Sequence, residues 1–412
     1  MKYPTSKLGN YIQILSGFAF KSKDFSDTGI PVVKIKNVTP PSVTLIDLSY
    51  VPNEIAEQKS KYILEYDDVL IALTGSHVNQ MTSVVGRVAR VKYSEITVLN
   101  QRVGKITVID RKNCDLDYIY YYLSQDKIKI QLASKASGAA NQANISPADI
   151  EELNIPFPDI HTQRKISSVL KRYDNLIENN KKQIKLLEEA AQRFYKEWFV
   201  DMRFPGYEST PIVDALPEGW SKTSAESFFE ITIGKTPPRV ESRWFSDMHS
   251  GVPWVSISDM GESDMFIFET SEGLSPNAIE QHNVKIVQSG TILLSFKLTV
   301  GRVCITTADM CTNEAIAHFR ITDDIYREYV YCYLKNYHYD SLGSTSSISK
   351  AVNSKIIKAM QFVMPNRELV EYFSKIAAPI FEQIQVKQKA CLELRKARDY
   401  LLPKLMNGEL EV

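Results

Sequence analysis

The sequence predicts a duplicated α/β (α+β) fold, in which two domains of mixed strands and helices are separated by two long helices that pair as an antiparallel coiled coil. Three observations predict it. Apolar residues recur at alternating intervals of four and three along residues 161–199, as is typical of a coiled-coil helix. This pattern returns 207 residues later, and motifs of the first domain reappear in the same order in the second. We therefore expect two halves related by a pseudo-twofold axis.

The repeat divides the chain into four regions. The first domain covers residues 1–158, the first long helix and its linker 159–205, the second domain 206–365 and the second long helix 366–412. Prolines and glycines after residue 200 cannot continue the first helix, so the chain turns there. Pro379 lies inside the second helix, which predicts that this helix kinks or begins late.

Each long helix carries a narrow apolar seam with its first polar residue near the middle, which is Asn180 in one and Lys387 in the other. Such residues tend to fix the register of paired helices. The predicted seam consists of Ile166, Leu170, Tyr173, Ile177, Asn180, Ile184 and Leu187 in the first helix, and of Phe373, Ile380, Ile384, Lys387, Leu394 and Leu401 in the second. The alternative is two separate amphipathic helices, each facing its own domain.

Within the first domain, period-two alternation and short apolar runs predict strands at residues 30–38, 67–73 and 84–91. A tyrosine-rich stretch at residues 116–132 predicts an amphipathic helix. A polar loop and a segment with two prolines then end the domain.

The second domain repeats this order. The stretch GIPVV at 29–33 returns as GVPWV at 251–255, and Gly-Arg-Val at 86–88 returns at 301–303. The tyrosine-rich helix reappears at residues 325–339. A period near 207 residues is far too long for a solenoid, so it indicates two domains of one fold.

Composition narrows the functional class. No run of about 18 apolar residues offers a membrane span, so we expect no membrane partner and a cytoplasmic location. The five cysteines are odd in number and scattered, which argues against a disulfide framework or a zinc knuckle. The formal net charges of the four regions are +2, +3, −6 and +1, which makes the second domain acidic.

Five stretches resemble the specificity subunit of prokaryotic type I restriction-modification systems: FYKEWFVDMRFPG at 194–206, LPEGW at 216–220, DYLLPKLMNGEL at 399–410, GIPVVKIKNV at 29–38 and GVPWVSISDM at 251–260. The resemblance implies that both domains are target recognition domains, each reading one half of a bipartite sequence in double-stranded DNA. It also implies that the helices are a spacer that docks two methyltransferase subunits and, with them, restriction/translocase subunits. S-adenosylmethionine, ATP and Mg²⁺ are then expected on those partners, and no cofactor or metal on this chain.

Base reading needs side-chain donors and acceptors on loops or strand ends that reach a groove. In the first domain the candidates are Lys34, Lys36, Asn37, Ser76, His77, Asn79, Gln80, Asn100, Gln101, Arg102, Asn141 and Gln142. In the second domain they are Lys235, Thr236, Arg239, Arg243, Ser256, Ser258, Lys297, Asn313 and the loop from Ser344 to Lys350. For each residue the alternative is an ordinary solvated loop or turn position.

The sequence offers no convincing catalytic set. Gly234-Lys235-Thr236 resembles the end of a P-loop, but Phe229 stands where that motif needs glycine. We therefore expect a non-catalytic subunit. Because it is neutral and one domain is acidic, it should bind DNA weakly by itself. The alternatives are a self-contained DNA-cleaving enzyme and a coiled-coil scaffold without a DNA partner.

Overall fold

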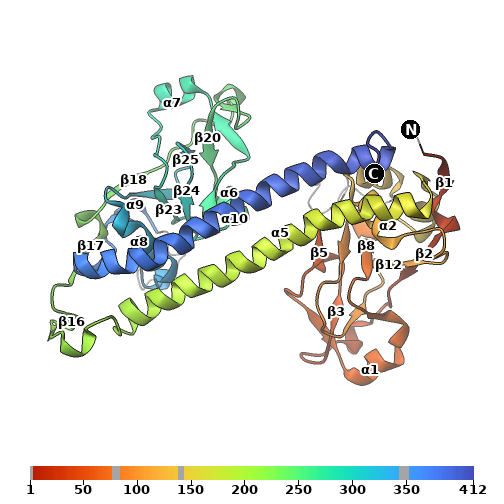
Figure 1. The fold of residues 1–412 in the computed structure, drawn as a ribbon, viewed down its shortest axis with the longest axis horizontal. Helices are drawn as coiled ribbons and strands as arrows, with labels where there is room; N and C mark the ends of the chain where they lie inside the picture. Colours follow the sequence, from red (N-terminus) through yellow and green to blue (C-terminus); the bar gives the residue numbers. More distant parts are fainter. Residues whose placement is uncertain (1–2, 77–83, 138–142, 343–351) are drawn as a thin grey trace. The chain divides into compact units, whose positions relative to one another are not determined.

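The computed structural model describes residues 3–76, 84–137, 143–342 and 352–412, and it forms two compact units (Figure 1). Unit 1 contains Met1–Asn175 and Leu394–Val412, and unit 2 contains Leu176–Glu393. Each unit therefore combines a globular domain with one segment of each long helix, whereas the sequence pattern predicts the helices as separate regions.

Unit 1 contains a six-stranded sheet and a four-stranded sheet. The first has the order β2 (Ile12–Ser16), β12 (Val103–Val108), β8 (Val69–Ala72), β10 (Val88–Arg90), β5 (Ser42–Val43) and β4 (Val38–Thr39). The second has the order β6 (Ser49–Val51), β3 (Ile30–Val33), β11 (Thr97–Leu99) and β7 (Ile63–Leu64). Two short pairs join β1 (Thr5–Lys7) to β14 (Asn154–Pro156) and β9 (Thr74–Gly75) to β13 (Ala143–Asn144). The helices are α1 (Asn53–Gln58), α2 (Leu116–Ser124), α3 (Asp126–Lys135) and α4 (Pro147–Glu151).

Unit 2 contains a five-stranded sheet with the order β18 (Glu230–Ile233), β26 (Ile316–Arg320), β23 (Ile292–Ser295), β24 (Val303–Thr306) and β21 (Phe266–Ile267). Its four-stranded sheet has the order β19 (Phe245–Ser246), β22 (Glu272–Leu274), β20 (Val252–Val255) and β25 (Cys311–Thr312). Short pairs join β17 (Ser221–Ser224) to β27 (Gln361–Met364) and β15 (Ile212–Val213) to β16 (Leu216–Pro217). The helices are α6 (Ile257–Glu262), α7 (Pro276–His282), α8 (Arg327–Asn336) and α9 (Ser354–Ala359).

The two units share one topology. The order β2-β12-β8-β10-β5 in unit 1 matches β18-β26-β23-β24-β21 in unit 2, and the last pair is parallel in both. In the smaller sheets, β3 pairs antiparallel with β6 and parallel with β11, as β20 does with β22 and β25. The units differ at the edges, where β7 extends one sheet and β19 the other. The internal duplication and the predicted fold class are confirmed.

Strand β8 shows why a short, uniformly apolar sequence forms a central strand. Val69 and Ile71 face one hydrophobic core, which includes the tyrosines of α2. Leu70 and Ala72 face a second core, which includes Val33 and Leu99. Because successive side chains of a strand point to opposite faces, a strand buried on both faces needs an apolar residue at every position.

The long helices are α5 (Ile160–Tyr195), which continues into a π-helical turn at Lys196–Val200, and α10 (Arg367–Asn407). In unit 1, Asp174 pairs with Arg398 at 2.6 Å, and Lys165 Nζ donates to the Val412 carbonyl at 3.2 Å. In unit 2, Cys391 Sγ donates to the Ile177 carbonyl at 3.7 Å, and the rings of Trp198 and Phe373 lie 6.0 Å apart. As residue numbers rise in one helix they fall in the other, so the helices run antiparallel in both units (Figure 1).

The predicted seam faces inward. Ile166, Leu170, Ile177, Ile184, Phe373 and Ile384 are buried, and Tyr173, Asn180, Leu187, Ile380, Lys387, Leu394 and Leu401 are half-buried. The seam is also part of the domain cores. Ile166, Leu170, Leu402 and Leu405 pack into the α2 core of unit 1. In unit 2 the ring of Phe199 contacts Trp220, Tyr329 and Phe373. The predicted pairing of the two helices is therefore confirmed, and the alternative of two separate helices is wrong. Each helix nevertheless also packs against the domains.

Several predicted boundaries are wrong. Helix α10 begins at Arg367 and passes through Pro379 without ending, so the expected late start does not occur. The predicted helix at residues 116–132 is two helices, because Gln125 is extended and starts α3 in a new direction. That break lets α2 bury the six consecutive residues from Tyr118 to Leu123, while α3 buries only Ile128, Leu132 and Ala133.

The predicted strand at residues 30–38 ends at Val33, and Ile35–Asn37 forms a 3-10 turn. The predicted strands at residues 67–73 and 84–91 shorten to β8 and β10, since Gly86, with φ of +83°, turns the chain before Val88. The predicted helix at residues 325–339 shortens to α8 behind a 3-10 turn at Asp324–Tyr326.

Candidate functional site

In unit 1 several loops converge at one edge of the sheets. The backbone N–H of Asn100 donates to the Val33 carbonyl at 3.1 Å, and that of Gln101 donates to the Phe18 carbonyl at 3.0 Å. The N–H of Leu73 donates to the Arg102 carbonyl at 3.0 Å. These bonds gather residues 17–20, 34–37, 73–76 and 100–102, which we call the first loop edge.

Unit 2 repeats this arrangement. The N–H of Asn313 donates to the Val255 carbonyl at 3.0 Å, that of Lys235 to the Thr312 carbonyl at 2.9 Å, and that of Phe296 to the Ala315 carbonyl at 2.9 Å. Residues 234–239, 256–259, 296–300 and 313–315 form the second loop edge. A glycine is required in each edge, because a Cβ on Gly17 would overlap the Asn100 carbonyl and one on Gly234 would overlap the Asn313 carbonyl.

The repeated Gly-Arg-Val motif supports both edges. Arg87 Nη2 donates to the Ile35 carbonyl at 3.3 Å, and Arg302 Nη1 donates to the Ile257 carbonyl at 2.5 Å. In unit 1 the arginine thus holds the 3-10 turn after β3, and in unit 2 it holds the start of α6 after β20. Burial lowers the pKa of Arg87. The motif is therefore structural, and it positions the candidate residues beside it.

Some candidate residues of the first loop edge are exposed to solvent and others are buried. Lys36, Gln101 and Arg102 are exposed, whereas Ser76 and Asn100 are buried. Lys34 is half-buried, and its ammonium lies 2.8 Å from the Ser49 hydroxyl and 4.2 Å from the centroid of the Phe25 ring. Burial, with a smaller contribution from Lys36, lowers the pKa of Lys34.

Asn37 is a structural residue of its turn. It is 0% exposed, its Oδ1 accepts from the Lys34 N–H at 3.0 Å, and its Nδ2 donates to the Ile46 carbonyl at 2.9 Å. In unit 2, Asp259 fills the equivalent position and accepts from the Ser256 N–H at 2.8 Å. Burial and these bonds leave the Asn37 amide no access to a ligand.

The candidates of unit 2 are more exposed. Lys235, Arg239, Arg243, Ser258 and Lys297 are exposed, and Thr236, Ser256 and Asn313 are half-buried. Ser256 caps α6, since its hydroxyl accepts from the Asp259 N–H at 3.2 Å. Asn313 Oδ1 accepts from the Ala315 N–H at 3.0 Å. The remaining candidates, His77, Asn79, Gln80, Asn141, Gln142, Ser344 and Lys350, lie outside the described residues.

Carboxylates that sequence reasoning missed lie against three of the candidate residues of unit 2. Arg239 Nη1 lies 2.7 and 3.0 Å from the two carboxylate oxygens of Glu272. Its guanidinium also lies 4.0 Å from the centroid of the Phe245 ring. Arg243 pairs with Glu241 at 2.6 Å, and Thr236 donates to Glu314. The one sequence signal of these carboxylates was Glu314, an acidic residue at the position where the first domain has Gln101. These pairs reduce the positive field that unit 2 offers to a phosphate backbone.

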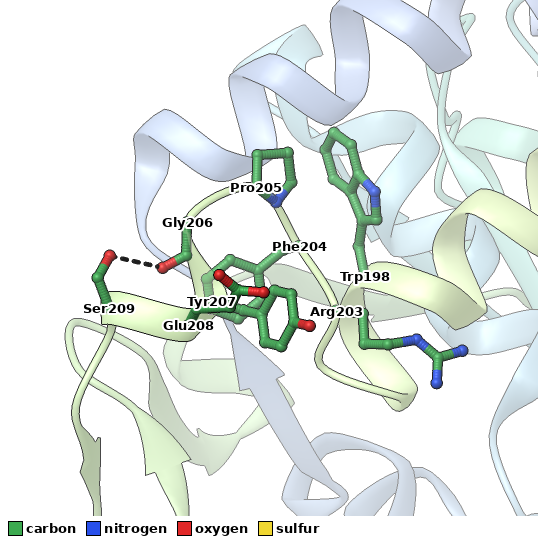
Figure 2. Close-up of a pocket in the computed structure, with 8 residues that line it drawn as sticks. All are labelled: Trp198, Arg203, Phe204, Pro205, Gly206, Tyr207, Glu208 and Ser209. Atoms are coloured by element: carbon green, nitrogen blue, oxygen red, sulfur yellow. Dashed lines mark hydrogen bonds between the residues drawn. The ribbon is translucent and has the colours of Figure 1, made fainter.

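Figure 2 shows a cavity of about 480 Å³ in unit 2, where the chain turns after α5. It is lined by Trp198, Arg203, Phe204, Pro205, Gly206, Tyr207, Glu208 and Ser209. Glu197 holds the Arg203 guanidinium through bonds of 2.6 and 2.8 Å, and Ser209 Oγ donates to the Gly206 carbonyl at 3.0 Å. Its polar side chains do not form a nucleophile-and-base pair, so the cavity does not resemble an active site.

A second cavity, of about 390 Å³, lies in unit 1 between α2 and α5 and is lined by Asp115, Asp117, Arg164, Ser167, Ser168, Lys171, Arg172 and Asn175. Burial of Asp117 opposes ionisation, but Arg90 at 2.5 Å and Lys171 at 2.9 Å outweigh it and lower the pKa of this carboxyl. Ser167 Oγ donates to Asp115 at 2.6 Å. Paired in this way, the carboxylates hold α2 against α5.

His318 lies in β26 and is buried. Its Nδ1 lies 2.8 Å from the Thr232 hydroxyl and its Nε2 lies 2.6 Å from the Thr312 hydroxyl. Burial lowers the pKa of His318 to about 4, so the ring is neutral at pH 7. Across the described ranges, no three His, Cys, Asp or Glu side chains lie close enough together to bind a metal ion.

Of the helices in the described part of the chain, none has both the length and the apolar composition that crossing a bilayer requires.

Comparison with known proteins identifies relatives along the whole chain. The sequence model of the family described as "Type I restriction modification DNA specificity domain" matches residues 2–189 and 217–390. The chain is 26% identical over 331 residues to the type I restriction enzyme MjaIX specificity subunit of Methanocaldococcus jannaschii, which covers 76% of this chain and 73% of that protein. It is 24% identical over 342 residues to the type I restriction enzyme HindI specificity subunit of Haemophilus influenzae, covering 68% and 73% respectively.

The crystal structure of a type I restriction-modification system S subunit from M. genitalium has the same fold. It superposes with a TM-score of 0.59 at 16% identity, covering 98% of this chain and 96% of that one.

Proposed function

The chain belongs to the type I restriction modification DNA specificity domain family, and from this premise we propose that each unit reads one half of a bipartite target in double-stranded DNA. The repeated topology carries this proposal. One arrangement of strand ends and loops occurs twice, and each copy displays exposed polar side chains on a rigid support. Rigid support matters because base-edge hydrogen bonds discriminate only when donors and acceptors are fixed.

We propose that α5 and α10 set the gap between the two half-sites. Both helices pass from one unit into the other, with 36 and 41 residues. At about 1.5 Å per residue they are about 54 and 62 Å long, more than the ~34 Å of one DNA turn. A target with an unread central gap follows from this length.

We further propose that other polypeptides carry out the chemistry. The family description names specificity, and the two cavities hold structural ion pairs and aromatic rings in place of a reacting set. The chain would then recruit two methyltransferase subunits and restriction/translocase subunits in the cytoplasm. S-adenosylmethionine, ATP and Mg²⁺ would bind to those partners.

The isolated chain is expected to bind DNA weakly. Its formal net charge is zero, and Glu272 and Glu241 pair with the candidate residues Arg239 and Arg243. Phosphate neutralisation supplies most non-specific affinity, so the partners would have to contribute much of the contact.

The test is selection from randomised duplexes, with the chain alone and with a methyltransferase subunit, followed by methylation mapping. We expect enrichment of one bipartite sequence only with the partner, and neither cleavage nor methylation by the chain alone. Tight sequence-specific binding without a partner, cleavage by the purified chain, or an uninterrupted target would contradict the proposal.

A further inference from the structure

Leu298, in the second loop edge, has two unfavourable properties together. Its side chain is 91% exposed, and its backbone has a φ of +62°. A left-handed backbone disfavours leucine relative to glycine or asparagine. Water gives no compensation, because an exposed apolar side chain gains nothing from hydration. Single exposed leucines are ordinary on protein surfaces, but one that is also held in a disfavoured conformation indicates a functional position.

The loop that carries Leu298 is fixed at its base. Ser295 is 0% exposed, and its Oγ donates to the Thr299 carbonyl at 2.5 Å and accepts from the Arg302 N–H at 3.0 Å. The Gly301 N–H donates to the Ser295 carbonyl at 2.9 Å. Phe296, which comes next, is 1% exposed, and its backbone N–H donates to the Ala315 carbonyl at 2.9 Å. Leu298 is therefore presented to solvent on a short rigid loop.

Exposed lysines accompany Leu298 in the second loop edge. Lys297 is exposed beside it, with its ammonium 5.6 Å from the centroid of the Phe296 ring, and Lys235 is exposed elsewhere in the second loop edge. Such cations suit phosphate contacts, which position a protein on DNA but do not read sequence. In the major groove the one apolar feature of a base edge is the 5-methyl group of thymine.

We propose that Leu298 is a specificity-determining residue of unit 2 that contacts the 5-methyl group of a thymine in the major groove. This inference rests on the proposed function, since it assumes that the second loop edge faces DNA. It adds an apolar contact with a base edge to the hydrogen bonds that the polar candidates offer. The half-site read by unit 2 therefore contains at least one A·T pair, recognised through its methyl group.

The test uses the complex with its methyltransferase subunits and the target found by methylation mapping. Each thymine is replaced in turn by deoxyuridine, which removes the methyl group and keeps the Watson–Crick pairing. We expect one replacement in the half-site of unit 2 to weaken binding about fourfold, the value for losing one buried methyl group. Replacements in the other half-site serve as controls for non-specific effects of deoxyuridine.

Two variants connect this effect to the residue. Leu298→Asn tolerates the left-handed backbone and lacks the apolar surface, so it should bind thymine and deoxyuridine duplexes equally. Leu298→Met keeps the apolar contact and should keep the preference for thymine. Thermal melts should show that both variants fold, as expected at an exposed position.

The outcomes separate the two proposals. Equal binding of thymine and deoxyuridine throughout this half-site, a half-site without thymine on either strand, or an unchanged preference in Leu298→Asn would each overturn the role of Leu298. Each of these results leaves bipartite recognition intact. Failure of the proposed function would instead remove sequence preference from the wild-type complex altogether.

Discussion

Replacing Asn37 by alanine should destabilise unit 1 and leave the DNA target unchanged. The substitution removes two hydrogen bonds, of 3.0 and 2.9 Å, from a side chain that is 0% exposed. A buried group that loses its partner costs ~1–3 kcal/mol. The Ile46 side chain is exposed, so water can reach that end of the turn, and we expect a total near ~2 kcal/mol. With a urea dependence near ~2 kcal/mol/M, the midpoint of unit 1 should fall by ~1 M.

The positions of the tryptophans allow the unfolding of each unit to be measured separately. Its four tryptophans, Trp198, Trp220, Trp244 and Trp254, all belong to unit 2. Tryptophan fluorescence therefore follows the unfolding of unit 2, while hydrogen exchange of β3 and β11 follows unit 1. In Asn37→Ala we expect faster exchange in unit 1 and an unchanged fluorescence transition.

The matched control is Lys36→Ala, one residue earlier and exposed. It should change stability by less than ~0.5 kcal/mol and weaken DNA binding by the complex at low salt. Methylation mapping of both variants completes the comparison. If Asn37→Ala altered the half-site while unit 1 kept its stability, the structural role assigned to this amide would be wrong.

Three further predictions concern acid, charge and length. Because burial lowers the pKa of His318 to about 4, from an unfolded value of 6.5, its contribution to stability is complete above pH 6.5 and declines as the pH falls to 4. By pH 5 the free energy of unfolding should have fallen by ~2 kcal/mol, at ~1.4 kcal/mol per pH unit. Urea unfolding at pH 7.5 and at pH 5 measures this fall, and it should be smaller in His318→Gln than in the wild type. Glu272→Gln should release Arg239 for phosphate contact and steepen the salt dependence of DNA binding, which filter binding at a series of salt concentrations would measure. The control is Glu280→Gln, which also removes one negative charge from unit 2 and should change the salt dependence less. Inserting the same number of residues into α5 and α10 should lengthen the gap and keep both half-sites, and methylation mapping that returned altered half-sites would refute the spacer.

Long-range regularity in the sequence predicted most of the fold. The heptad seam located both helices, because apolar side chains at positions such as Ile166 and Ile384 must be removed from water whatever surrounds them. The duplication was visible because Gly-Arg-Val occurs in both units, and its arginine supports the segment after GIPVV in one and after GVPWV in the other. Local boundaries failed where a tertiary contact decided them. Nothing in residues 116–132 signals that Gln125 breaks the helix, and the burial of Asn37 depends on the distant Ile46 carbonyl.

The candidate site was only partly predictable for the same reason. Residue type marked Lys36, Gln101, Arg239 and Lys297 as surface donors, and the structure leaves them exposed. Sequence could not indicate that Glu272 neutralises Arg239, because 33 residues separate them and only the folded chain brings them together. Nor could sequence identify Leu298, because its assignment depends on its left-handed backbone angle and on the buried Ser295 that fixes its loop.

Each unit completes its core with pieces of both long helices, Ile166 and Leu405 in one and Phe199 and Phe373 in the other. A hybrid protein that exchanges one domain between relatives should therefore be joined inside the helices, near residues 175 and 393, and not at the domain ends near 158 and 365. Joints inside the helices would transfer each domain together with the helix segments that complete its core. Joints at the domain ends would pack the core of the transferred domain against helix side chains from the other protein.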